Sequence, residues 1–168
     1  MRQPHSIINK FTLCCSIISF TVCLVSRISF DIPIGMLHIV KGICLLPPIW
    51  IYNLISYAWF FLIGLAFGAL LDKTLKGING GNDEIAVYKG GIFFITSLFL
   101  GLIHYHIFFI AEMLFLAFLV SAMCMMSALI TATLWRYVRP KVSCFIMYCF
   151  TIWQFYLFFV SLSVFLNN

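Results

Sequence analysis

The sequence predicts an all-α integral membrane protein, a single domain over residues 1–168 that forms a bundle of five transmembrane helices. Of its 168 residues 64% are hydrophobic and only 9% are charged, and the mean hydropathy is +1.11. Soluble domains carry about 25% charged residues, so this chain cannot cover a water-facing surface. The composition therefore excludes a soluble domain, a disordered chain, a disulfide-stapled secreted fold and a nucleic-acid-binding module.

Five apolar segments have the length that a membrane crossing requires, since a bilayer core of about 30 Å takes roughly 20 apolar residues per helix. The second segment follows Pro47-Pro48, and proline suits the start of a helix because its missing N–H would have no partner there. Between the second and third segments, residues 72–89 are polar and rich in glycine, which predicts a loop. The predicted helices span residues 9–28, 49–71, 90–106, 112–135 and 142–166.

The apolar stretch over residues 92–134 is too long for one span and suits two. Its ionisable residues cluster between His104 and Glu112, so we place the break between the third and fourth helices there. His104-x-His106 together with Glu112 is also a candidate metal site, because imidazole and carboxylate are good metal ligands. Two histidines at i and i+2 do not share a helix face, which favours a polar hairpin over a metal site.

Charge placement supports this count. Five spans put the N-terminus and the second and fourth loops on one side of the membrane, with eight of the ten Lys and Arg residues: Arg2, Lys10, Lys73, Lys76, Lys89, Arg136, Arg139 and Lys141. Only Arg27 and Lys41 fall on the other side. By the positive-inside rule we expect a cytoplasmic N-terminus, an outer C-terminus and a bacterial inner membrane, with Arg27 snorkelling from the end of the first helix.

An alternative for the first segment is a secretory signal peptide, because Arg2 and Lys10 precede its apolar core. No small-x-small cleavage site follows Ser26, and cleavage would leave four helices and disturb the charge split. We therefore predict a membrane helix that stays in the protein.

Motifs for catalysis are missing from the sequence. None of the seven cysteines are spaced Cys-x-x-Cys, as a redox or zinc motif would require. No Asp, Glu, Lys or Arg lies in the middle of a predicted span, which argues against a proton-coupled pump. We expect a non-enzymatic protein with no catalytic residue, no metal and no required cofactor.

Small and polar residues recur at helical spacing in three of the predicted helices. Such stripes usually face other helices, because lipid tails offer polar groups no partner. Close packing is one interpretation, and a ligand cavity lined by aromatic rings with a few polar anchors is another. Gly64-x-x-x-Gly68 is the best candidate for close packing, and a homodimer contact through the same two glycines is equally compatible.

The segment Pro47-Pro48-Ile49-Trp50-Ile51-Tyr52, which continues to Phe60, Gly64 and Ala66, resembles the second-helix signature of the translocator protein family, also called tryptophan-rich sensory proteins. The resemblance covers roughly residues 40–168. Its further matches are Phe94, Leu98, Leu100 and Phe108-Phe109 in the third helix and Phe150, Trp153, Tyr156 and Asn168 in the last.

The chain also departs from the family pattern, as a divergent member would. Ser97, Gly101 and His104 stand where the family usually has Gln, Asn and Trp, and the acid of the fourth helix is missing near Val120. Ser161 replaces the Asn of the fifth helix. These departures weaken the polar anchors of the family pocket.

The resemblance implies a membrane receptor or transport-type protein, often dimeric, that binds a planar hydrophobic molecule such as a porphyrin, or a sterol-like molecule. Its pocket would open under the first loop, residues 29–48, where Lys41 could pair with an acidic substituent. Alternatives are a substrate-binding subunit of a multi-component transporter and a porphyrin-degrading enzyme. The resemblance places the pocket at Trp50, Tyr52, Ser56, Phe60, Ser97, Gly101, His104, Trp153, Leu157 and Ser161, with Trp50, Phe60 and Trp153 stacking on the ligand.

Overall fold

The computed structural model describes residues 10–28, 47–75, 81–138 and 141–167, and within these ranges it is helical, with no strand. Each of the five helices is long and apolar enough to cross a membrane. The prediction of an all-α, five-helix membrane protein is confirmed. The helices are α1 Lys10–Ile28, α3 Ile49–Leu75, α4 Gly81–Phe109, α5 Leu114–Trp135 and α6 Lys141–Asn167.

The helix ends differ from the prediction mainly in the polar segment after the second span. Helix α3 continues to Leu75 instead of ending at residue 71, and α4 begins at Gly81 instead of residue 90. Polar residues can stay helical where a helix leaves the bilayer, because the backbone hydrogen bonds are made within the helix. The break between α4 and α5 was predicted closely: α4 ends at Phe109, and Glu112 in the turn has a φ of 54°.

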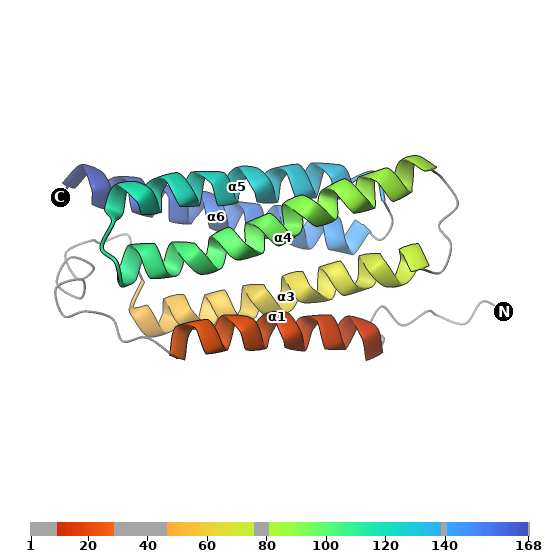
Figure 1. Cartoon of the computed structure of the whole chain (residues 1–168), viewed down its shortest axis with the longest axis horizontal. Helices are drawn as coiled ribbons and strands as arrows, with labels where there is room; N and C mark the ends of the chain where they lie inside the picture. Colours follow the sequence, from red (N-terminus) through yellow and green to blue (C-terminus); the bar gives the residue numbers. More distant parts are fainter. Residues whose placement is uncertain (1–9, 29–46, 76–80, 139–140, 168) are drawn as a thin grey trace.

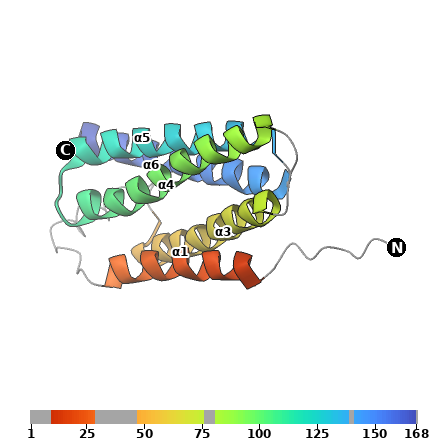
Figure 2. The same ribbon diagram turned by 45° about the vertical axis from the view of Figure 1, so that its right-hand side comes forward.

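The helices form two groups, joined mainly through α3. Helix α1 packs along α3, and α5 packs along both α4 and α6. Helix α3 contacts α6 less extensively than these pairs and contacts α4 over a still smaller area. Figures 1 and 2 show α1 against α3, on the side away from α5 and α6. The interior therefore lies between the α1–α3 pair and the group of α4, α5 and α6.

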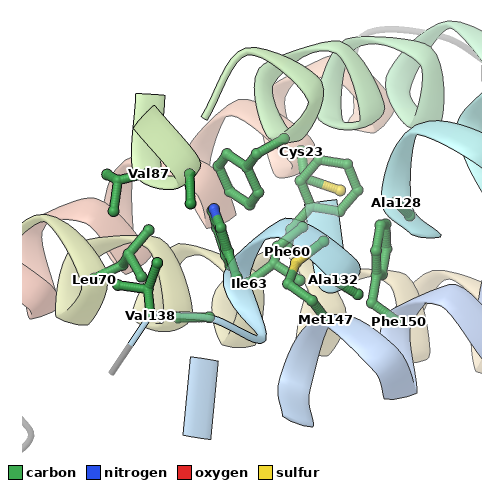
Figure 3. Close-up of a cluster of buried hydrophobic side chains, with 14 residues drawn as sticks. Cys23, Phe60, Ile63, Leu70, Val87, Ala128, Ala132, Val138, Met147 and Phe150 are labelled. Atoms are coloured by element: carbon green, nitrogen blue, oxygen red, sulfur yellow. The ribbon is translucent and has the colours of Figure 1, made fainter. Parts of the chain in front are cut away.

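A core of buried side chains fills the middle of the bundle and draws on all five helices (Figure 3). Cys23 comes from α1, Phe60 from α3, Val87 from α4, Ala128 from α5 and Met147 from α6. A second cluster lies toward the end where α1 and α4 finish and α3 begins. Its buried members are Tyr52, Tyr105, Phe108, Phe109, Ala117, Leu157, Val160 and Val164.

Gly64 and Gly68 are the points at which α3 meets α1. A Cβ atom at Gly64 would lie 2.7 Å from Ser16 Cα and 2.8 Å from the carbonyl oxygen of Cys15. At Gly68 it would lie 2.7 Å from Thr12 Cα. The motif thus serves packing within one chain, and α1 already occupies this face. The alternative interpretation, a homodimer contact through Gly64 and Gly68, therefore has no support from the structure.

This contact predicts opposite effects of alanine at two glycines. We expect Gly64→Ala to lower the stability of the bundle by about 1–3 kcal/mol, because the backbones of α1 and α3 must move apart. Gly91→Ala is the matched control, since its Cβ would meet only Phe67 Cε2 at 3.9 Å, and alanine favours a helix by up to about 1 kcal/mol over glycine. Thermal unfolding in detergent measures both, and equal melting temperatures for the two variants would contradict the assignment.

Candidate functional site

Nine of the ten predicted site residues lie on the inner faces of three helices. Each helix supplies three residues about one turn apart, a spacing that places them on one face. Seven are buried, and Gly101 and Trp153 are partly exposed. Helix α3 supplies Tyr52, Ser56 and Phe60, α4 supplies Ser97, Gly101 and His104, and α6 supplies Trp153, Leu157 and Ser161.

Contacts between these residues join the three helices in pairs. The rings of Tyr52 and Trp153 lie 6.1 Å apart between centroids, which joins α3 to α6. His104 Nε2 and Ser161 Oγ are 3.0 Å apart, which joins α4 to α6. A Cβ at Gly101 would lie 3.8 Å from Phe60 Cζ, so α4 and α3 also meet here. The predicted residues therefore form one neighbourhood.

Trp50 does not share this neighbourhood. Its side chain is 68% exposed, whereas that of Tyr52 is 2% exposed. Two residues along a helix correspond to a rotation of about 200°, so these side chains face opposite directions. The prediction that Trp50 stacks on a ligand beside Phe60 and Trp153 has no support from this placement.

The buried imidazole of His104 forms the polar centre of the site. It is 4% exposed, pairs with the Ser161 hydroxyl and stacks on Phe108 at 5.6 Å between ring centroids. His106 turns elsewhere, with Nδ1 2.9 Å from the carbonyl oxygen of Leu102. The two histidines thus take different partners, and no group of three or more metal-ligating side chains gathers within the described ranges.

Two of the serines are hydrogen-bonded within their own helices. Ser56 donates to the carbonyl oxygen of Tyr52 at 2.9 Å, and Ser97 donates to that of Phe94 at 2.8 Å. Because each hydroxyl proton is used in this hydrogen bond, these serines do not have it free to donate to a ligand. A ligand would therefore meet mostly apolar walls here, with the His104–Ser161 pair as the polar group between helices.

Arg27 places a positive charge at one end of this group of residues. The expectation that its side chain would snorkel outward was wrong. The side chain is 6% exposed and turns into the bundle instead of snorkelling outward. Nη1 donates to Asn53 Oδ1 at 2.6 Å. Cζ lies 4.3 Å from the ring centroid of Tyr105, 5.1 Å from that of Tyr52 and 5.7 Å from that of Tyr57.

The surroundings of Arg27 explain why it turns inward. It lies in the last turn of α1, where the partial negative charge of the helix end favours a cation. A guanidinium within about 6 Å of an aromatic centroid is attracted to the ring face, and three tyrosines meet this condition. The Tyr52 ring contacts both Arg27 and Trp153, so it lies between the charge and the rest of the predicted pocket.

Comparisons with protein-family models, curated proteins and solved structures find no match. Membership of the translocator protein family therefore stays a prediction from the residues quoted above. The site is argued below from its own geometry.

The contact between His104 and Ser161 should be visible as an energetic coupling. We expect Ser161→Ala to destabilise the bundle by about 1–3 kcal/mol, because it leaves a buried imidazole nitrogen without its partner. In the background of His104→Phe the same change should cost much less. A double-mutant cycle of unfolding free energies in detergent measures the coupling, and additive effects would show that the pair contributes no stability.

Proposed function

We propose that this protein is a non-enzymatic membrane receptor or transport-type protein that binds a planar hydrophobic molecule between α3, α4 and α6. The observation that carries the proposal is the convergence of nine predicted residues from three helices. Tyr52, Trp153, His104 and Ser161 lie at the contacts that join those helices. A tetrapyrrole is the ligand that the family resemblance implies, with a sterol-like molecule as the alternative.

The aromatic character of the site suits a flat ligand. Trp153 stacks on Tyr156 at 5.2 Å, and Tyr52 packs on Phe109 at 5.3 Å between centroids. Ring faces of this kind pair with other aromatic rings in stacked or tilted geometries. Pockets for small molecules are mostly apolar with a few placed polar groups, and His104 with Ser161 is such a group.

Partial exposure of Trp153 gives a ligand an approach from the edge of the bundle. The indole borders both buried clusters, so it lies between the tightly filled middle and the tyrosine-rich end. A ligand stacking there would replace ring–ring contacts within the protein by ring–ligand contacts. Trp153 is therefore the residue whose removal tests the proposal most directly.

Binding of protoporphyrin IX to the detergent-purified chain tests this function. We expect saturable binding in the micromolar range or tighter, and Trp153→Ala should weaken it at least tenfold, or about 1.4 kcal/mol. Trp50→Ala is the matched control, because the Trp50 side chain is 68% exposed outside the site. The porphyrin Soret band should be followed, since removing a tryptophan would itself alter fluorescence quenching.

Absence of saturable binding, or equal effects of the two alanine variants, would refute the assignment of the site. A porphyrin that disappears in the light only while Trp153 is present would instead favour the degrading enzyme. Co-purification with a nucleotide-hydrolysing partner would favour the transporter subunit.

We further propose that the site faces the outer side of the membrane, with the N-terminus in the cytoplasm. Lys10, Arg136 and Lys141 lie at one end of the bundle, where α1 and α6 begin and α5 ends (Figure 1). Arg27 is the one Lys or Arg of the described residues at the other end. Cationic residues favour the cytoplasmic side, so the Arg27 end would be outside.

A reporter fused after Asn168 tests this orientation. Alkaline phosphatase, which folds only outside the bacterial cytoplasm, should be active in that fusion, whereas green fluorescent protein in its place should stay dark. The opposite pattern would invert the proposed topology.

A further inference from the structure

We propose that Arg27 is the anchor for a carboxylate or phosphate group, so that the ligand of this protein is an acidic amphiphile. The acid would bind the guanidinium at the end of the bundle, and the apolar body would extend past Tyr52 toward Trp153. This inference rests on the proposed function and specifies the chemistry of its ligand.

The first argument is the energetic cost of the charge. An arginine at the centre of a membrane span costs roughly 2.5–3.5 kcal/mol on insertion scales, and one near a helix end normally lowers its cost by extending its head group toward water. Arg27 precedes the final residue of α1, yet it is only 6% exposed. The guanidinium is thus buried where an arginine would ordinarily be extended.

The second argument is that the described residues around Arg27 are neutral. Asn53 contributes an amide oxygen, and Tyr52, Tyr57 and Tyr105 contribute ring faces worth about 0.5–2 kcal/mol each. Within the described part of the chain, no carboxylate lies within 4.0 Å of a cationic nitrogen of Arg27. These contacts stabilise the cation without neutralising its charge.

The third argument is the unused hydrogen-bonding capacity of the side chain. Nε of Arg27 is shielded from solvent and has no hydrogen-bond partner among the residues that the structure describes. A guanidinium carries five N–H donors in a planar fork, and Nη1 donates to Asn53. Carboxylate and phosphate oxygens match that fork and bind it through two parallel hydrogen bonds, which the opposite charges make stronger than those to an uncharged acceptor.

The position of Arg27 separates the acid from the apolar body. Arg27, Asn53 and Tyr105 all lie within about two turns of a helix end, at the same end of the bundle. Tyr52 continues inward from Arg27 to Trp153, at 6.1 Å between ring centroids. A ligand with its acidic group at Arg27, near the headgroup level, and its apolar part among the rings fits this arrangement. Either a free amphiphilic acid or an anionic phospholipid has these two parts.

A pair of matched ligands tests the proposal. Protoporphyrin IX and its dimethyl ester share one ring system, but only the free acid carries carboxylates. In nanodiscs of phosphatidylcholine we expect the wild-type chain to bind the diacid at least tenfold more tightly than the ester. Arg27→Gln should lower the affinity for the diacid to that for the ester and leave the affinity for the ester unchanged. Retained ester binding would also show that the variant folds.

Two further variants test whether the preference for the diacid depends on the charge of residue 27, on the shape of its guanidinium, or on the position of the cation in the bundle. Arg27→Lys keeps the charge but loses the fork, so it should retain only part of the preference for the diacid. Lys10→Gln removes an exposed cation from the other end of the same helix and should alter neither affinity. An equal loss of preference in Lys10→Gln would overturn the proposal, because a general electrostatic attraction would then explain it.

The source of the anion is distinguished by changing the lipid. If a phospholipid occupies the site, phosphatidylglycerol in the nanodisc should raise the melting temperature of the wild type, but not of Arg27→Gln, and should compete with the diacid. If a free acid is the ligand, phosphatidylglycerol should change neither quantity. The first result would place a phospholipid at the Arg27 site. The second, together with the preference for the diacid over the ester, would assign the site to a free acid.

The failures of the two proposals are distinguishable. Equal binding of diacid and ester to the wild type and to Arg27→Gln would overturn the anion anchor and leave the proposed function standing. If neither porphyrin binds, the proposed function fails, and a rise in melting temperature with dodecyl phosphate that Arg27→Gln abolishes would still establish the anion site.

Asp31 provides the remaining test, since it follows Arg27 closely in sequence and lies outside the described residues. If the chain itself supplied the counter-ion, Asp31→Asn would lower the melting temperature as much as Arg27→Gln does. That result, together with equal binding of diacid and ester, would make Arg27 part of a structural ion pair and overturn the proposal.

Discussion

The close approach of α1 to α3 is the constraint on which the arrangement of the site depends. Gly64 and Gly68 leave no room for a side chain against the backbones of Ser16 and Thr12. With α1 held at that distance, its last turn lies beside the first turns of α3. Arg27 therefore reaches Asn53 and the surrounding tyrosines, which a helix docked further away would not allow.

Hydrogen bonds between helices reinforce this packing where lipid offers no alternative partner. Ser143 of α6 donates to the carbonyl oxygen of Ala66 in α3 at 2.7 Å, and the thiol of Cys124 in α5 donates to that of Ser97 in α4 at 3.2 Å. A polar group that faced hydrocarbon would lose such a bond. Helices α3, α4, α5 and α6 thus hold the interior in place, whereas α1 depends on its contact with α3.

Much of the fold could be predicted because it follows from periodic apolar patterns. The lengths of the apolar runs predicted all five helices, and the spacing of small and polar residues predicted the inward faces of α3, α4 and α6. Trp50 was placed in the pocket by motif matching, although helix geometry sets it about 200° from Tyr52. Helix ends outside the apolar runs were also missed, because hydropathy carries no signal for polar helical turns.

Arg27 could not be placed from its own sequence context. At the end of an apolar helix an arginine can extend to water or turn inward, and only the neighbouring helix decides between the two. Here the decision comes from Tyr52, Asn53 and Tyr57 on α3 and from Tyr105 on α4. Their positions become informative only once α1 is known to lie against α3.

The site thus joins two polar features that make different demands on a ligand. His104 and Ser161 are paired with each other at 3.0 Å, so a ligand that reached them would have to share or replace that contact. Among the described residues Arg27 has only neutral neighbours, and its shielded Nε has no partner there, so an acid would gain a charge-assisted contact. Because the described residues bury this cation without a carboxylate partner, it is the less stable of the two arrangements, and we expect selection among ligands of similar apolar shape to follow their acidic group. The aromatic rings around Trp153 would then set the shape of the ligand and Arg27 its charge.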